Sequence, residues 1–310
     1  MNNTTFMNRR IGQGFCGTVW SSEMENARAI KREDGGPGRS LRNDYIMHQK
    51  IRAAMDTACR VYLPVCYEYV HADDSNWWTE HLPAFPEDYQ VPCNVLVSDR
   101  IPPFSEATRN KLVDLYCPTS LKPSIKLSEP DRDCLIRPYL GRRRRLVRQS
   151  RFQAFSLRNY PLHIDQIEDL RLDDALYAEI MAETLAELYW NAHVDANDVE
   201  FVLAPPRKDN GTHTEATIQS NALGEHVIWL LEFACCKHMP LDEMGVEQAV
   251  AAFYRNDPFY PRPGQEDNKD EALWRGFKDR FLERSAEILG QESPGTYLPA
   301  LWVDLVEQRA

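Results

Sequence analysis

One acidic loop and one glycine-rich loop contain the residue types that could do chemistry. The acidic stretch 193–203 reads HVDANDVEFVL and contains His193, Asp195, Asp198 and Glu200. Carboxylates and histidine are the usual groups for proton transfer, and a loop between packed elements often carries function. The plainer alternative is an ordinary helix-to-strand turn, because Asp and Asn are common turn residues.

The glycine-rich stretch 11–19 has the pattern G-x-G-x-x-G-x-V, with glycines at Gly12, Gly14 and Gly17, and an A-I-K run ending at Lys31 follows it. Glycines let the backbone approach a phosphate closely, and successive N–H groups form an anion cradle. Strand-like residues flank this pattern, which argues against the dinucleotide-binding turn that opens a helix. A hairpin without a ligand is the alternative.

A third stretch that could contribute to chemistry follows the acidic loop. The apolar run 227–231 ends in Glu-Phe-Ala at 232–234, where a strand followed by Asp-Phe-Gly is the pattern of protein kinases. In the same set, His193 and Asp195 match the front of H-x-D-x-x-x-x-N, with Glu200 in the place of Asn. These four pieces also occur in the same order as in protein kinases: first the glycine loop, then Lys31, the acidic loop and Glu232.

The chain therefore resembles the protein-kinase-like superfamily, in its small-molecule-kinase or aminoglycoside-phosphotransferase style. It is also similar to a fungal family of kinase-fold proteins that has the D-V-E-F-V-L stretch. The segments that carry the resemblance are Lys31 to Gly38, Arg100 to Pro103, Asp195 to Leu203 and Asn256 to Pro258.

The resemblance implies an α+β fold with two lobes around a cleft. Residues 1–103 would form an N-lobe with a small antiparallel β-sheet, and residues 104–310 a mainly helical C-lobe. The C-lobe would contain a catalytic-loop-like segment at 191–203 and an insertion at 205–225. The insertion is polar and rich in turn residues, so it is expected to be a flap that proteases cut first.

The resemblance also implies roles for most of these residues. Asp195, preceded by His193, would accept a proton from the acceptor hydroxyl, whereas Asp198 would only cap the turn. Lys31 would contact the phosphates of ATP and pair with Asp44 of the following helix. Gly12, Gly14 and Gly17 would lie over the phosphates, and Arg100 would open the hinge that holds the adenine.

Glu200 and Glu232 would hold Mg²⁺, because carboxylate oxygens are its preferred ligands. Three convergent acids repel each other, so a metal, Lys31 or an arginine must neutralise part of their charge.

Three functions stay open. The first is an ATP- and Mg²⁺-dependent kinase of a small molecule. The second is a pseudokinase or binding module, and the third is acid–base chemistry on a metabolite with Asp195 or Glu200 as base.

Helices and strands are expected on both sides of these loops. Ser40 can cap a helix that runs to about Ala58, and a helical pattern spans Asp173 to Trp190. Strands are expected within 8–33, at 94–98 and at 199–203. The basic run Arg142 to Arg145 is a solvated face, a localisation signal or an anion-binding patch.

Composition narrows the class of protein. The chain has 310 residues and a formal net charge of −11, which disfavours nucleic acid and acidic membranes as partners. No apolar run reaches the length of a membrane span. Eight cysteines show neither CxxC nor zinc-like spacing, so we expect a reduced, cytoplasmic protein.

Overall fold

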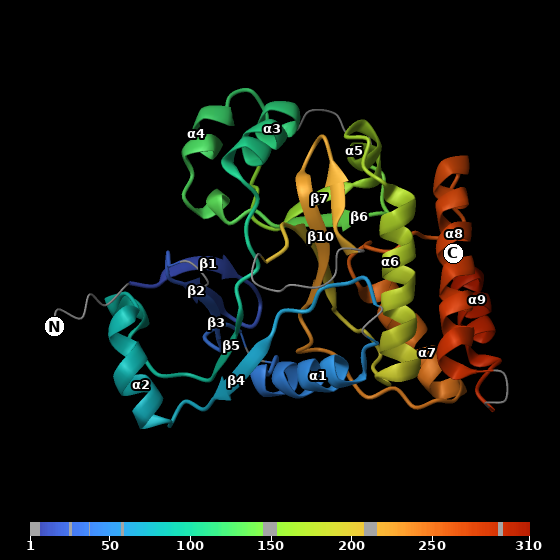
Figure 1. Ribbon diagram of the computed structural model, residues 1–310, viewed down its shortest axis with the longest axis horizontal. Coiled ribbons are helices and arrows are strands. Elements are labelled where there is room, and N and C mark those ends of the chain that lie inside the picture. The colour runs from blue at the N-terminus through green and yellow to red at the C-terminus, as the bar shows by residue number, and fades with distance from the viewer. Residues whose placement is uncertain are drawn as a thin grey trace.

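The structure is a computed structural model that describes residues 7–24, 27–36, 38–56, 59–144, 154–207, 216–290 and 294–310. Within these ranges helices are mixed with two five-stranded sheets. The second sheet lies between the first sheet and a stack of long helices (Figure 1). The predicted mixture of helices with an antiparallel N-terminal sheet is confirmed, whereas the domain boundary at 103 stays a prediction.

The N-terminal sheet is antiparallel throughout, with the strand order β1-β2-β3-β5-β4. Its strands are β1 (Arg9–Gln13), β2 (Thr18–Ser21), β3 (Arg28–Arg32), β4 (Cys66–Val70) and β5 (Val95–Asp99). Short helix α2 (Ser75–His81) covers part of it, and Trp78 of this helix shares a small core with Trp20 and Phe85. The three short strands predicted within residues 8–33 are therefore present.

Helix α1 (Leu41–Ala54) follows β3 and brings a carboxylate to the sheet. As predicted, Ser40 caps it, and its hydroxyl accepts a hydrogen bond from the Asn43 N–H at 3.4 Å. The buried residues recur at helical spacing and are Leu41, Asp44, His48 and Ile51. Asp44 therefore lies on the face turned toward the protein interior. The helix ends before the predicted Ala58.

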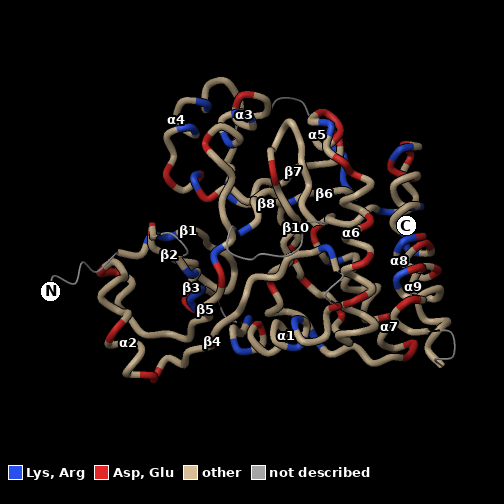
Figure 2. The backbone as a smooth tube through the Cα atoms, in the orientation of Figure 1, with Lys and Arg blue, Asp and Glu red and all other residues tan. Residues whose placement is uncertain are grey.

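The central helix of the second part is α6 (Asp174–Ala186), which is buried on nearly all sides. It packs against the second sheet and against α8 (Asn268–Leu289). Charged residues of both signs alternate along α8 (Figure 2), and its Arg280 pairs with the buried Glu183 of α6 at 2.7 Å. The remaining helices are α3 (Glu106–Tyr116), α4 (Lys122–Leu127), α5 (Ile164–Asp169), α7 (Glu243–Arg255) and α9 (Leu298–Gln308).

A π-turn, Glu187–Asn191, continues α6 and ends the helix predicted for Asp173 to Trp190. The Ala192 N–H donates to the Glu187 carbonyl oxygen at 2.8 Å, five residues back. Such a turn accommodates an extra residue and often lies at a functional site. The acidic loop follows directly. Among the helices of the described ranges, none has both the length and the apolar sequence of a membrane span.

The second sheet has the order β7-β6-β8-β10-β9, in which β6 and β7 are parallel and the other neighbours antiparallel. Its strands are β6 (Ile136–Tyr139), β7 (Tyr160–His163), β8 (Glu200–Ala204), β9 (Ile218–Ser220) and β10 (Gly224–Leu231). The sequence predicted β8 and β10 in a mainly helical part, and the structure adds β6, β7 and β9.

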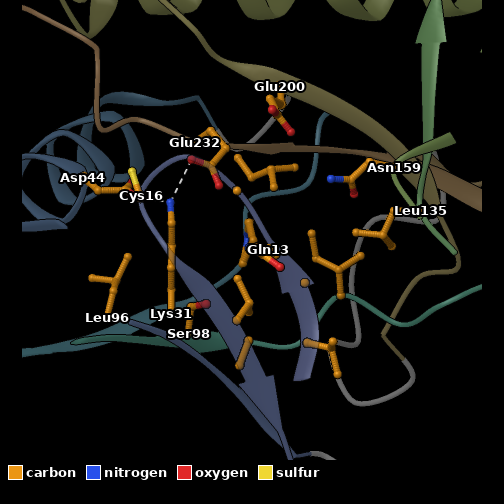
Figure 3. Close-up of a pocket in the computed structure, with 18 of the residues that line it drawn as sticks. Gln13, Cys16, Lys31, Asp44, Leu96, Ser98, Leu135, Asn159, Glu200 and Glu232 are labelled. Atoms are coloured by element: carbon orange, nitrogen blue, oxygen red, sulfur yellow. Dashed lines mark hydrogen bonds and ion pairs between the residues drawn. The ribbon is translucent and has the colours of Figure 1, made fainter. Parts of the chain in front are cut away.

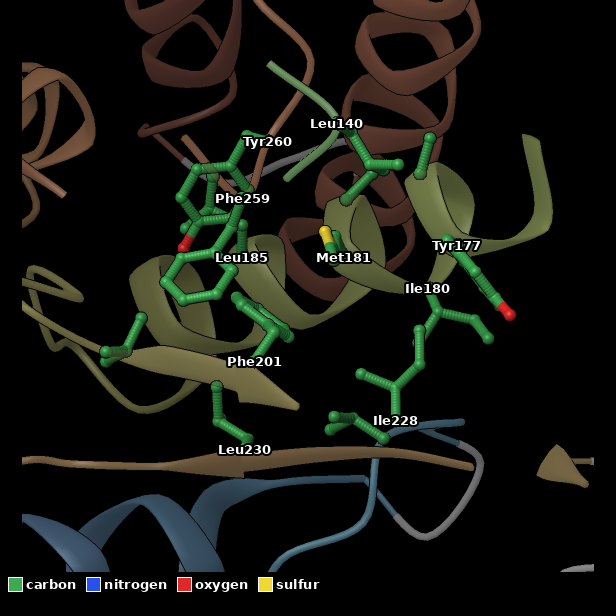
Figure 4. Close-up of a cluster of buried hydrophobic side chains, with 14 of the residues drawn as sticks. Leu140, Tyr177, Ile180, Met181, Leu185, Phe201, Ile228, Leu230, Phe259 and Tyr260 are labelled. Carbon is green, nitrogen blue, oxygen red and sulfur yellow. The ribbon is translucent and has the colours of Figure 1, made fainter. Parts of the chain in front are cut away.

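Side chains of β8 and β10 alternate between two buried faces, as the period of a strand requires. The face toward α6 belongs to the large core shown in Figure 4 and consists of Phe201, Leu203, Ile228 and Leu230. The opposite face packs with Ile101 and Leu135 and consists of Val202, Ala204, Val227 and Trp229. Burial on both faces fixes the strand ends from which Glu200 and Glu232 project.

Two predicted segments lie partly outside the described residues. Arg145 belongs to none of the described ranges, whereas Arg143 pairs with Glu168 at 2.8 Å and with Asp270 at 2.5 Å. The described part of this basic run thus makes ion pairs within the protein. The insertion predicted at 205–225 is described at both ends, and Pro205 accepts a hydrogen bond from the Trp229 indole at 3.2 Å. Its cutting by proteases stays a prediction.

Candidate functional site

A cavity of about 450 Å³ lies between the N-terminal sheet and the paired strands β8 and β10 (Figure 3). Its apolar wall consists of Ile11, Val19, Ala29, Leu96, Ile101, Leu135 and Leu231. Its charged wall includes Lys31, Arg39, Asp44, Arg100, Arg137, Asp198, Glu200 and Glu232. A cavity of this size with an apolar wall and convergent charged groups is a candidate small-molecule site. Every residue predicted to bind cofactor or metal lines it.

The glycine loop connects β1 and β2 over this cavity. Gly14 N–H donates to the Gly17 carbonyl oxygen at 2.8 Å, which closes the turn. Gly17 has φ of 146°, and a Cβ there would lie 2.2 Å from the Arg32 carbonyl oxygen. Only glycine fits this position. The Asp34 carboxylate accepts hydrogen bonds from the Thr18 N–H and hydroxyl, both at 2.7 Å, and so fixes the loop against the end of β3.

Lys31 of β3 is held between two carboxylates. Its amine donates to Asp44 Oδ2 at 2.8 Å and to Glu232 Oε2 at 2.7 Å, and Figure 3 shows the contact with Glu232 beside Cys16. Burial alone would lower the pKa of Lys31, but the two carboxylates raise it above its ordinary value. Asp44 Oδ1 also accepts the Phe233 N–H at 3.1 Å. The predicted Lys31–Asp44 pair is present.

The two predicted catalytic residues lie away from the cavity. Asp195 is 1% exposed, and its carboxylate accepts hydrogen bonds from the N–H groups of Lys237 at 2.9 Å and Asn197 at 3.1 Å and from the Gln248 amide at 2.8 Å. Its oxygens thus hold the acidic loop to the chain after β10. The His193 carbonyl oxygen accepts a hydrogen bond from Lys50 at 3.1 Å. Neither residue contributes to the cavity lining.

Asp198 is the aspartate of this loop that faces the cavity. Its carboxylate pairs with Arg39, which lies between β3 and α1. Its N–H donates to Asn256 Oδ1 at 2.6 Å, and the Asn256 amide donates to the Ala196 carbonyl oxygen at 2.8 Å. Asp198 has a φ of 64°, in the left-handed region that ordinary side chains rarely adopt. Asn256 therefore holds a backbone conformation that directs this carboxylate into the cavity.

Glu200 opens β8 and is paired with Arg137 of β6. Both carboxylate oxygens accept hydrogen bonds from Arg137 Nη2, at 2.6 and 2.5 Å, and Arg137 also lies 3.5 Å from Asp257. The pKa of Glu200 is raised to about 7, mainly by burial; Arg137 opposes this increase and the nearby Glu232 contributes to it. A carboxyl group that titrates near neutral pH is suited to proton transfer.

Replacing Glu200 by Gln is expected to change how stability depends on pH. The folded pKa of about 7 lies above the ordinary value of 4.5, so the folded protein binds the extra proton between these values. The wild type should therefore lose roughly 1–3 kcal/mol of unfolding free energy, relative to E200Q, as pH rises through this window. Urea unfolding of both proteins across the window measures the difference. A difference that does not change with pH would contradict the raised pKa.

Arg100 lies at the other end of the cavity, after β5. Its guanidinium donates to the Ser22 carbonyl oxygen and to Asp133, both at 3.0 Å. Asp133 also accepts hydrogen bonds from Arg9 of β1. Arg100 thus fastens the hinge segment to the N-terminal sheet, and a contact with a ligand stays a prediction.

The two predicted Mg²⁺ ligands, Glu232 and Glu200, differ in how many of their carboxylate oxygens accept hydrogen bonds from a cation. Glu232 uses Oε2 for Lys31, whereas both oxygens of Glu200 accept from Arg137. Mg²⁺ bound with a nucleotide takes one or two protein carboxylates plus phosphate and water oxygens. Glu232 fits that role, and Glu200 does not while Arg137 holds it. In the part of the chain that the structure describes, no three His, Cys, Asp or Glu side chains gather around one point.

Sequence reasoning missed Arg39 and Arg137 as residues of the cavity and assigned Asp198 to a turn. No motif marks either arginine. Arg137 meets Glu200 across 63 residues of sequence, so its partner is defined only when β6 and β8 pair. The one available signal was the crowding of acids, which required nearby cations.

Comparison with known proteins gives limited matches. A protein family described as DUF3669, zinc finger protein, matches residues 228–293. The described part of that stretch contains no gathered set of metal-ligating side chains. The chain is also similar to the kinase domain of maize sucrose-induced receptor kinase 1, solved with AMP-PNP. The identity is 12%, the TM-score 0.33, and the alignment covers 98% of this chain and 79% of that one. Curated proteins give no match.

Proposed function

We propose that the cavity binds a nucleoside triphosphate such as ATP, and that the chain transfers its terminal phosphoryl group to a hydroxyl of a small molecule. The observation that carries the proposal is the Lys31 amine, held between Asp44 and Glu232 under a glycine loop. A lysine fixed in this way is a recurring part of phosphoryl-transfer sites, where it meets the phosphates. The small-molecule acceptor follows from the sequence resemblance.

The two walls of the cavity suit the two halves of a nucleotide. The apolar wall near Ile101 and Leu231 would accept an aromatic base, and backbone groups of the hinge would satisfy its polar edge. The glycine loop and Lys31 would face the phosphates, where N–H groups and a cation favour negative charge. A Mg²⁺ ion bound to Glu232 would supply further neutralisation of phosphate charge.

Asp198 is our candidate for the proton acceptor, in place of Asp195. The acceptor oxygen would bond to the terminal phosphorus while the bond from phosphorus to the bridging oxygen breaks. The nucleoside diphosphate leaves with that electron pair, and the hydroxyl proton passes to the Asp198 carboxylate. Lys31 would stabilise the charge that develops on the phosphate oxygens. Glu200, paired with Arg137, would keep the charge beside the acceptor balanced.

A binding module without turnover is the second candidate. Each of the four acids that line the cavity from the second part is already paired: Asp133 with Arg9 and Arg100, Asp198 with Arg39, Glu200 with Arg137 and Glu232 with Lys31. A cleft neutralised in this way could hold a nucleotide as a structural ligand. Acid–base chemistry on a metabolite would rest instead on the raised pKa of Glu200.

Nucleotide binding is expected to raise the melting temperature of the purified protein. A ligand at about 100 times its Kd stabilises the folded state by roughly 2.7 kcal/mol. The measurement compares ATP, ADP and GTP, each with Mg²⁺ and with EDTA. A shift followed by ADP release in the presence of small hydroxyl compounds supports phosphoryl transfer, and a shift without ADP release supports the binding module. No shift with any nucleotide rules out both.

A further inference from the structure

We propose that Arg39 is a phosphate-binding residue, and that its exchange from Asp198 to the phosphates of the nucleotide frees Asp198 to accept a proton. The inference rests on the proposed nucleotide site and adds a mechanism by which donor binding switches on the base. It concerns an ion pair that joins the segment before α1 to the acidic loop across the cavity.

Arg39 is in a suitable place to meet a phosphate. It lines the cavity next to the glycine loop, and its guanidinium carbon lies 5.1 Å from the centre of the Phe15 ring in that loop. A guanidinium binds phosphate oxygens through two parallel hydrogen bonds. Arg39 could therefore contact a phosphate group that the glycine loop holds.

Arg39 is one of two cavity cations with a single acid partner. Lys31 has two carboxylate partners, and Arg137 has Glu200 and Asp257. Among the described residues Arg39 forms one ion pair, with Asp198, and Arg100 forms one, with Asp133, but Arg100 also donates to the Ser22 carbonyl oxygen. A polyphosphate adds several negative charges, and of these two arginines Arg39 is the one beside the glycine loop.

The Arg39–Asp198 pair can be exchanged at small cost. The side chains are 25% and 40% exposed, and ion pairs at that exposure contribute little net stability because water screens them. The position of Asp198 does not depend on Arg39, since Asn256 holds its N–H at 2.6 Å. When Arg39 turns to a phosphate, the Asp198 carboxylate would stay in the cavity and lose its counter-ion.

This exchange would couple donor binding to catalysis. In the empty cavity the Asp198 carboxylate accepts a hydrogen bond from the Arg39 guanidinium, so that oxygen is occupied and does not face an incoming hydroxyl group. With a triphosphate bound, the same carboxylate has no cation against it and can accept the hydroxyl proton. The base would thus become available only when a phosphoryl donor is present.

The test measures the affinities of ATP and adenosine by calorimetry on the full chain and four variants. Arg39→Gln is expected to weaken ATP binding by about ten- to a hundred-fold, the usual effect of losing hydrogen bonds to a charged group. Adenosine has no phosphate, so its affinity should stay unchanged. Asp198→Asn removes the competing partner and is expected to strengthen ATP binding by up to about fivefold. Arg42→Gln, at an exposed position of α1, is the control.

The outcomes separate this inference from the proposed function. If wild-type protein binds neither ATP nor adenosine, the nucleotide site itself is absent. If Arg39→Gln weakens both ligands equally, or Asp198→Asn weakens ATP as much as Arg39→Gln does, the pair only supports the cleft and the exchange is overturned. Melting temperatures check folding, and Arg39→Lys, which keeps the charge but not the paired donors, gives an intermediate loss of ATP affinity if the inference holds.

Discussion

Replacing Lys31 by methionine is expected to lower the unfolding free energy by about 3–5 kcal/mol and to abolish the stabilisation by ATP. The amine is the shared partner of Asp44 and Glu232, at 2.8 and 2.7 Å. Without it, two carboxylates face each other in a largely buried site, and Asp44 is only 3% exposed. Denaturant unfolding gives the loss of stability, and thermal melting with ATP gives the loss of binding.

Charge repulsion between Asp44 and Glu232 can be distinguished from a loss of packing by changing the pH. The destabilisation of K31M should shrink in acid, because the two carboxylates can then take up protons and stop repelling each other. Lys269→Met, at an exposed lysine of α8, should change stability by less than about 0.5 kcal/mol. A K31M protein as stable as the wild type at neutral pH would show that the lysine does not hold these acids in solution.

The second large effect concerns the two aspartates of the acidic loop. Asp195→Ala is expected to lower the unfolding free energy by about 3 kcal/mol or more, because the N–H groups of Asn197 and Lys237 lose their acceptor and the Gln248 amide keeps only the His238 carbonyl oxygen. Asp198→Asn should change stability by less than about 1 kcal/mol, since the side chain is 40% exposed. Its effect should fall on turnover, with a loss of about a hundred- to ten-thousand-fold.

These predictions make Asp198 the base and Asp195 a structural residue, which reverses the roles assigned from the spacing of the motif. Asp195→Asn is the informative companion variant, because it keeps the size of the side chain. If Asp195→Asn removes turnover while the melting temperature is unchanged, and Asp198→Asn keeps turnover, then the base is Asp195 and the arrangement around it must differ in the working state. Both measurements use the same preparation, so misfolding is detected directly.

The parts of the site that depend on local sequence could be predicted. The glycine pattern required a tight strand connection, and Gly17 adopts a φ that other residues avoid. Ser40 marked the start of α1, the helix that contains Asp44. The Lys31–Asp44 pair was implied by the kinase resemblance, and the structure contains it.

The parts that depend on distant contacts could not be predicted. The spacing of H-x-D-x-x-x-x-N gives the position of Asp195 along the chain, but its side-chain direction is set by donors at Lys237 and Gln248. Likewise, Arg137 reaches Glu200 only because β6 joins the second sheet beside β8. That strand has a short and ordinary sequence, with nothing to mark it as part of a site.

The π-turn at Glu187–Asn191 has a consequence for how this loop could change in evolution. A π-turn holds one residue more than the α-helical turn it replaces. Because the π-turn absorbs its extra residue, deleting one residue there would restore a regular helix and leave the acidic loop pointing in the same direction. Deleting one residue from α6 itself would instead rotate everything after it by about 100° around the helix axis, and Asp198 would leave the cavity although every side chain of the loop was retained. The π-turn is therefore a place where the chain can lose one residue without moving the site, and a pair of single-codon deletions, one in the turn and one in α6, would reveal the difference.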